Sequence, residues 1–161
     1  MRIDRHVHAD SRGHFSRLFC EEELAACGWD TPVRQINETM THEQGAVRGM
    51  HFQHPPAAED KLVTCLSGEI FDVAVDMRRG SPTFLNWHGE ILSAQNKRSL
   101  LIPKGFAHGF QALSSDCQLV YLHSAPFDSE SEGACIPSTL HWRSNGHYPL
   151  PSYHRVMLRT R

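Results

Sequence analysis

Short runs of β-branched and apolar residues, separated by turn signals, fill the middle of this sequence. In residues 69–77, EIFDVAVDM, the side chains alternate, so that Phe71, Val73 and Val75 share one face of an extended chain. Further runs of this kind, bounded by turns that contain Ser-Gly, Pro-Lys-Gly and Ser-Ser-Asp, occupy residues 61–66, 98–103 and 117–123. Strands at a spacing of about ten residues predict a closed or sandwiched β fold, which usually holds a ligand in its mouth.

One short helix is expected at residues 21–28, EEELAACG, because acidic residues suit the start of a helix and Gly28 suits its end. The chain has 161 residues and contains neither an internal repeat nor a low-complexity linker. That length fits one domain with a sizeable core. We therefore expect residues 1–161 to form a single domain built mostly of β-strands.

The charge balance and the cysteine pattern restrict the possible functions. Charged residues make up 21% of the chain and the net charge is -2, which weighs against a nucleic-acid or membrane-surface binder. No apolar run of about 18 residues occurs, and the first ten residues lack the apolar centre of a signal peptide. The five cysteines are scattered without a Cys-x-x-Cys motif, which favours reduced thiols. A cytoplasmic location is therefore expected.

Residues 101–110, LIPKGFAHGF, place Pro-x-Gly-x-x-His at a turn that leads His108 onto the next strand. This pattern resembles the second motif of cupins, whose first motif supplies His-x-His and a carboxylate. The candidates for that first motif are His51, His54 and Glu59. Because His51 and His54 are three residues apart, they point to opposite faces of a strand. We therefore expect no metal site, and a metal-dependent cupin enzyme is kept only as a remote alternative.

The stretch RGMHFQ, residues 48–53, contains the first candidate for chemistry. On a regular strand His51 shares a face with Gly49 and Gln53, while Arg48 takes the other face. A glycine before the histidine leaves room for a ligand to approach the backbone. Polar side chains within apolar strands are costly to bury unless they meet a ligand or a network, and this chain offers five such candidates. They are His51, Lys61, Asp72, His108 and Tyr121.

Taken together, these motifs resemble the dTDP-4-dehydrorhamnose 3,5-epimerase family, and DSRGHFSRLF, LSAQNK and the Glu132-Gly133 pair complete the match over roughly residues 10–133. The resemblance implies an all-β cupin double-stranded β-helix, a jelly-roll-like barrel with one or two short helices. It implies a nucleoside-diphosphate 4-keto sugar as the substrate, with no metal and no cofactor. It also implies a homodimer in which a strand or arm of one subunit completes the site of the other.

The resemblance also implies a role for individual residues. His51 matches the general base, Tyr121 the general acid on the opposite side of the pocket, and Lys61 the cation that stabilises an enolate. Asp72 matches a buried aspartate that supports the site, and we expect it to orient His108. Arginines that hold the diphosphate are matched by Arg12 and Arg48, and further pocket contacts by Gln35, Asn37, His108 and Glu132.

Epimerisation next to a ketone requires these residue types for chemical reasons that do not depend on the family resemblance. A C–H bond next to a ketone is a weak acid, so epimerisation needs a base that works near neutral pH and a donor that holds the enolate oxygen. Inversion needs a second acid on the opposite face, and a tyrosine is a neutral donor at pH 7. Arginine forks suit diphosphate oxygens. The expected reaction is inversion at C3, C5 or both.

Two departures from the resemblance bear on catalysis. The family's histidine base is usually paired with an aspartate near the C-terminus, but no Asp or Glu follows Glu132 in this sequence. His51 therefore lacks that partner or borrows a carboxylate from elsewhere. Phe127 stands where an aromatic hydroxyl is expected, which removes one hydrogen bond to the substrate. The alternative function is a weakened cupin that binds a nucleotide sugar without turnover.

Overall fold

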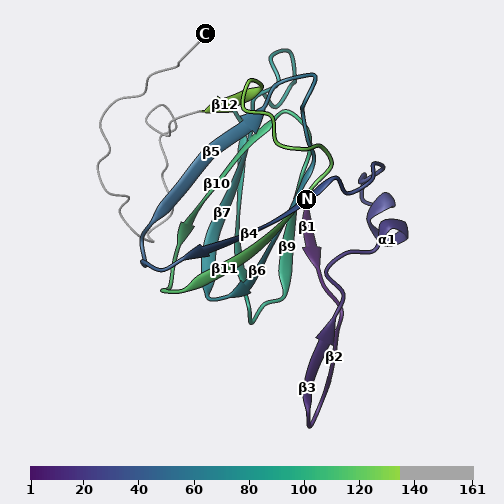
Figure 1. Ribbon diagram of the computed structural model, residues 1–161, viewed down its shortest axis with the longest axis vertical. Coiled ribbons are helices and arrows are strands. Elements are labelled where there is room, and N and C mark those ends of the chain that lie inside the picture. Colours follow the sequence, from purple (N-terminus) through teal and green to yellow (C-terminus); the bar gives the residue numbers. More distant parts are fainter. Residues whose placement is uncertain (135–161) are drawn as a thin grey trace.

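The computed structural model describes residues 1–134, which form two five-stranded antiparallel sheets that face each other (Figure 1). The first sheet has, in spatial order, the strands β1 (Arg2–Asp4), β9 (Arg98–Ile102), β6 (Lys61–Ser67), β11 (Cys117–His123) and β4 (Gln35–Thr41). The second sheet has, in spatial order, the strands β12 (Glu132–Ala134), β5 (Val47–Gln53), β10 (Phe106–Ala112), β7 (Glu69–Asp76) and β8 (Trp87–Ser93). Strands that follow each other in sequence therefore alternate between sheets in several places, as in a jelly-roll-like barrel.

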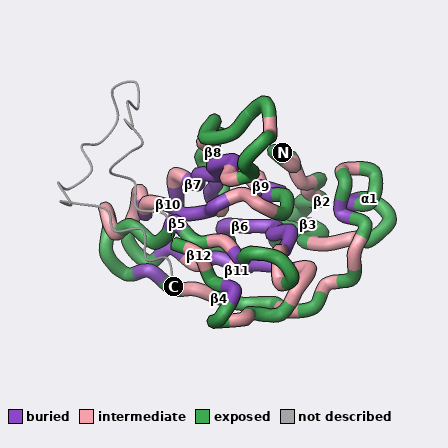
Figure 2. Tube along the Cα trace, turned by 90° about the horizontal axis from the view of Figure 1, so that it is seen from above, coloured by how far each residue is buried: buried purple, intermediate pink, exposed green. Residues whose placement is uncertain are grey.

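The alternation predicted for residues 69–77 is present in β7, but both of its faces are buried. Val73 and Val75 pack with Met50 and Ala107 on one face of the second sheet. Ala74, on the other face, belongs to the core between the sheets, together with residues of β6, β9, β10 and β11. Figure 2 shows the buried segments along the central strands, including β6 and β10, and exposed residues in the surrounding loops.

The predicted helix is α1 (Glu21–Ala25), which is shorter than the expected range of residues 21–28. Beyond it the backbone N–H groups of Cys27 and Gly28 donate to carbonyls three residues earlier, so the chain tightens and leaves the helix. Leu24 is the buried residue of the helix. It packs over the outer side of the first sheet with Trp29, Leu62, Leu101 and Leu122.

A hairpin of β2 (Val7–Asp10) and β3 (Gly13–Ser16) projects away from the barrel (Figure 1). Arg12 lies at its tip, where it pairs with Asp10, and its side chain is 88% exposed. The hairpin is therefore an arm that its own barrel leaves largely uncovered.

The expected thiol state fits the described part of the chain, where Cys20, Cys27, Cys65 and Cys117 are all free. Cys135, the fifth cysteine of the sequence, lies outside the described residues. Within residues 1–134, no helix is both long and apolar enough to span a membrane.

Candidate active site

A cleft lies between strands β4, β6 and β11 of the first sheet and β5 and β10 of the second. Its two adjoining hollows have volumes of about 270 and 230 Å³ and share four lining residues, Asn37, His51, Lys61 and His123. Other predicted site residues also line it, namely Gln35, Arg48, His108, Tyr121 and Glu132. Residues that are far apart in the sequence are thus collected at one mouth of the barrel, as the sequence predicts.

Strand β5 positions His51 through an irregularity that sequence periodicity does not reveal. His108 of β10 lies opposite His51, and Gly109 lies opposite Gly49, so Met50 is an extra residue without a partner on β10. This bulge turns Met50 to the other face of the sheet, where it packs with Val73 and Val75, and brings both Arg48 and His51 to the same hollow. The expectation that Arg48 takes the opposite face from His51 is therefore wrong.

Gly49 makes this bulge possible. Its φ is +113°, and a Cβ atom there would lie 2.5 Å from the Cα of Gly109. Only a glycine fits a strand neighbour this close with that backbone conformation. The space beside Gly49 is thus taken by the backbone of β10, whereas the sequence had suggested that it was left for a ligand.

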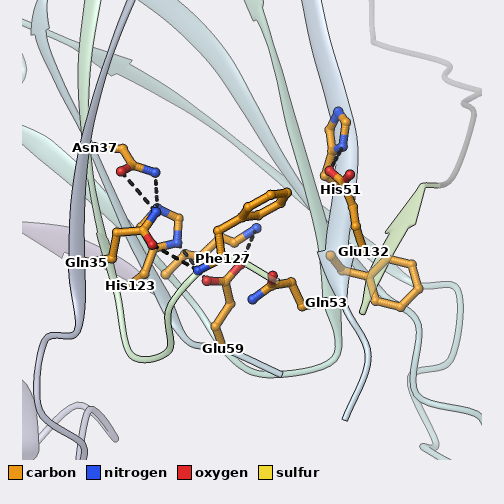
Figure 3. A pocket seen from close by; sticks show the side chains of 10 residues that line it. Gln35, Asn37, His51, Gln53, Glu59, His123, Phe127 and Glu132 are labelled. Carbon is orange, nitrogen blue, oxygen red and sulfur yellow. Dashed lines mark hydrogen bonds and ion pairs between the residues drawn. The ribbon is translucent and has the colours of Figure 1, made fainter. Parts of the chain in front are cut away.

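A carboxylate does contact His51, and it comes from β12. The Nδ1 atom of His51 lies 3.0 Å from Oε1 of Glu132. In Figure 3 this pair stands on one side of the pocket, across from Gln35, Asn37 and His123. Residues 147–161, where the resemblance places the usual partner of the base, lie outside the described residues. Glu132 was predicted as a substrate contact, and its proximity to His51 was not foreseen.

Lys61 is held by a buried carboxylate that also holds a histidine. Oε1 of Glu59 lies 3.0 Å from Nζ of Lys61, and Oε2 lies 2.8 Å from Nδ1 of His123. On its other side, His123 Nε2 lies 3.4 Å from the amide nitrogen of Asn37 (Figure 3). Burial acts to raise the pKa of Glu59, but the hydrogen bond from His123 and the charge of Lys61 bring it below its usual value. Glu59 therefore stays ionised as the counter-charge of Lys61.

Glu59 and His123 are site residues that the sequence reasoning missed. The sequence pattern offered Glu59 only as a candidate metal ligand, and His123 was not among the expected site residues. The signal that could have found both is the strand period, because Glu59 lies two residues before Lys61 and His123 two residues after Tyr121. Each therefore points to the same side as its predicted partner.

Tyr121 and His108 face each other deeper in the cleft, with ring centroids 6.0 Å apart. The Nε2 atom of His108 lies 2.5 Å from Oδ1 of Asp72, which is fully buried behind it. The expected Asp72–His108 contact is thus present. Burial, and then the nearby Asp72, raise the pKa of Tyr121, more than the hydrogen bond with Thr39 and the charge of Arg48 lower it. The phenol therefore keeps its proton at neutral pH.

The remaining predicted residues differ in position. Gln35 donates to Asn37 and accepts the backbone N–H of Phe127, which fixes the rim of the cleft. Arg48 donates to the Thr41 hydroxyl at 3.0 Å. Arg12, at the tip of the hairpin, does not line the cleft of its own chain.

The three candidates for a first cupin metal motif are engaged separately. His51 meets Glu132, Glu59 meets Lys61 and His123, and the ring of His54 packs on Phe52. Across residues 1–134, no group of three His, Cys, Asp or Glu side chains is arranged to hold a metal ion.

Comparison with known proteins identifies the family of the chain. The model of the family described as dTDP-4-dehydrorhamnose 3,5-epimerase matches residues 1–143. The chain belongs to this family. It is 44% identical over 123 residues to the dTDP-4-dehydrorhamnose 3,5-epimerase of Sinorhizobium fredii, an alignment that covers 76% of this chain and 63% of the relative. The chain thus spans less than two thirds of the length of that epimerase and of several other relatives.

Solved structures of this epimerase family have the same fold. The Bacillus anthracis dTDP-4-dehydrorhamnose 3,5-epimerase with TDP and PPi bound is 34% identical, with a TM-score of 0.83, and the match covers 96% of this chain and 86% of that one. A 3'-monoepimerase from Streptomyces bikiniensis in complex with dTDP-quinovose is 32% identical, with a TM-score of 0.82, covering 94% and 78%. The predicted all-β cupin barrel is therefore confirmed.

Proposed function

We propose that the chain is an isomerase that inverts C3, C5 or both of a 4-keto-6-deoxyhexose linked to a nucleoside diphosphate. The observation that carries this proposal is the hollow of about 230 Å³ that His51, Lys61 and Tyr121 line together. His51 belongs to β5 of one sheet and Tyr121 to β11 of the other. A base and an acid on opposite walls are what inversion of a carbon centre requires.

In the proposed first step, His51 takes a proton from the carbon next to the ketone. The electron pair of that C–H bond becomes the double bond of an enolate, and the ammonium of Lys61 stabilises the charge on its oxygen. Tyr121 then gives its proton to the opposite face of the same carbon, and the carbonyl is restored. Tyr121 regains a proton and His51 loses one to solvent, so the balance needs no cofactor.

The nucleotide part of the substrate is proposed to meet the arginines. Arg48 lies at the same hollow as His51, where its guanidinium can hold diphosphate oxygens. The bound TDP in one related epimerase and the bound dTDP-quinovose in another support a thymidine diphosphate sugar as the first candidate.

Arg12 is proposed to act in the cleft of a second copy of the chain. The hairpin that carries it projects from the barrel (Figure 1), and Phe15 of β3 is 66% exposed. A homodimer in which the hairpins reach across would bury this apolar surface and add a second arginine to the site. The free thiols of the described cysteines support the proposed cytoplasmic location.

The test is incubation of the protein with a dTDP-linked 4-keto-6-deoxyhexose in heavy water, followed by NMR of the sugar. Deuterium at C3, C5 or both is expected, and its position names the carbon that is attacked. The same incubation with CDP- and GDP-linked sugars ranks the nucleotides. A sugar that binds but gains no deuterium at any carbon would contradict the proposed isomerase.

Phe127 favours one alternative, a cupin that binds a nucleotide sugar without turnover. It lines the cleft at the place where the family resemblance leads one to expect a hydroxyl group, and it offers none. Binding of the sugar nucleotide by calorimetry, without exchange in heavy water, would support this alternative over the isomerase.

A further inference from the structure

The contact between His51 and Glu132 answers a question that the sequence leaves open. Residues 133–161 contain no Asp or Glu, so this stretch offers no carboxylate side chain to a base. Glu132 itself lies on β12, the edge strand of the second sheet, which pairs antiparallel with β5. Its Oε1 atom lies 3.0 Å from Nδ1 of His51, within hydrogen-bond distance.

The strand register explains why a glutamate reaches the base. Glu132 lies opposite Gln53, and Ala134 lies opposite His51, so Glu132 and His51 are diagonal neighbours on one face. Diagonal partners are separated by about 7–8 Å, a distance that long side chains can bridge. An aspartate at position 132 is one methylene shorter, and we expect it to fall short of the imidazole.

Gly133 allows β12 to lie this close to β5. A Cβ atom on Gly133 would meet the ring of Phe52 at 2.8 Å and Nε2 of His54 at 2.9 Å. A side chain there would require the Phe52 ring, the His54 ring or the edge strand itself to shift. Glu132 thus supplies the carboxylate, and the small Gly133 next to it lets β12 lie close to β5.

We infer that Glu132 is the positioning residue of His51 in this chain, an inference that rests on the proposed isomerase function. A carboxylate at Nδ1 accepts the N–H of that nitrogen and leaves Nε2 with the lone pair that a base needs. When the proton of the substrate carbon moves to Nε2, the imidazole becomes a cation, and the Glu132 carboxylate stabilises it without taking the proton.

This role differs from a structural one. Both side chains are partly open to solvent, 53% exposed for His51 and 40% for Glu132, so the pair adds little to folding. Its effect is on which imidazole nitrogen carries the proton and on the orientation of the ring. The consequence is therefore measurable in the His51 side chain itself.

The experiment compares Glu132→Ala and Glu132→Asp with the wild type, with Glu130→Ala as the control. Glu130 is an exposed carboxylate in the turn before β12, so its removal changes the charge but not the contact. The first readout is the rate of deuterium uptake into the sugar at saturating substrate. The second is the ¹⁵N NMR signal of the His51 imidazole, assigned by its loss in His51→Ala.

We expect Glu132→Ala and Glu132→Asp to lower the exchange rate about tenfold to a hundredfold, with little change in KM, and Glu130→Ala to leave it unchanged. The ¹⁵N signal should report an Nδ1–H imidazole in the wild type and a mixture of tautomers in both Glu132 variants. Glu132→Gln replaces any variant that fails to fold. Its Oε1 atom still accepts from Nδ1 but carries no charge, so the Nδ1–H signal should stay while the exchange rate falls.

Two results would overturn the inference. One is a wild-type His51 signal and exchange rate in the Glu132 variants. The other is a rise in KM with an unchanged His51 signal, which would make Glu132 a substrate contact. If the wild type itself exchanges no deuterium, the proposed function fails, while the His51 signal still decides whether Glu132 positions the imidazole.

Discussion

His51 of β5 and Tyr121 of β11 line one hollow from the two opposing sheets of the barrel. Neither residue is near the other in sequence, and no single sheet carries both. The barrel therefore supplies two proton-transfer groups whose directions of approach differ, and Lys61 of β6 lines the same hollow. That separation is the physical basis for removing a proton from one face of a sugar carbon and returning it to the other.

Tyr121→Phe should separate exchange from inversion. His51 still removes the proton and can return deuterium to the same face, but the donor on the opposite wall is gone. We expect deuterium uptake to persist while formation of the inverted sugar falls by about 10²–10⁴-fold. NMR of the sugar measures both quantities in one sample. Equal losses of exchange and inversion would place Tyr121 in the first step instead.

Alkaline pH should destabilise the fold partly through Tyr121. Burial raises the pKa of this phenol above its ordinary value of 10, so the unfolded chain loses the proton first. The stabilisation is complete below about pH 10 and is lost as the pH rises toward the folded-state value. Urea unfolding at rising pH should therefore show a smaller loss of free energy in Tyr121→Phe than in the wild type. The Cys65 thiol, whose pKa burial raises to about 12, contributes equally in both.

Glu59→Gln should weaken both the fold and the reaction. Lys61 and Glu59 are nearly buried, so removing the carboxylate leaves a desolvated cation, which costs about 3 kcal/mol of unfolding free energy. His123 loses its partner as well. Chemical denaturation measures the first effect, and kcat the second. Glu43→Gln, a neutralisation on the surface, serves as the control and should change neither.

Gly49→Ala tests the bulge that brings Arg48 and His51 together. Gly49 and Gly80 both have a positive φ, but only at Gly49 would a Cβ atom strike a neighbouring strand. Gly80→Ala should therefore cost about 1 kcal/mol from backbone strain alone, and Gly49→Ala clearly more. Gly49→Ala should also lose activity, because the clash with β10 shifts β5 and the two site residues that it carries. Equal unfolding free energies for the two variants would show that β10 does not constrain the bulge.

Arg12→Ala tests the proposed use of the hairpin across a dimer. The side chain is exposed at the tip of the hairpin, so the thermal midpoint should not change. We expect KM for the sugar nucleotide to rise about tenfold, as for the loss of one charge-assisted contact. Arg79→Ala, an exposed arginine before β8, is the matched control. A wild-type protein that sediments as a monomer and is still active would contradict the proposal that each hairpin reaches into the cleft of a second copy.

The sequence predicted the strands because those signals are local, whereas Gln35, Asn37 and Glu132 were expected at the cleft from the family resemblance. Alternation in residues 69–77 and the turn before His108 depend only on neighbours along the chain. These two features required no knowledge of which strands pair. The contact between Asp72 and His108 joins β7 and β10, and it was expected from the family resemblance instead.

The misjudged features depend on contacts between distant strands. Arg48 was placed on the wrong face because periodicity assumes a regular strand, and the bulge at Met50 exists only when β5 pairs with β10. The carboxylate that contacts His51 belongs to Glu132 of β12, which lies 81 residues later in the chain. Glu59 and His123 meet only when β6 and β11 are adjacent.

The most direct test of the account is deuterium uptake by a dTDP-linked 4-keto-6-deoxyhexose with the wild type and with His51→Ala. The wild type should exchange the hydrogen at C3, C5 or both, and the variant should lose at least about 10²-fold in rate at every exchanging carbon. Folding of the variant is checked by its thermal midpoint. A folded His51→Ala protein that exchanges at the wild-type rate would contradict the assignment of the base, and with it the proposed mechanism.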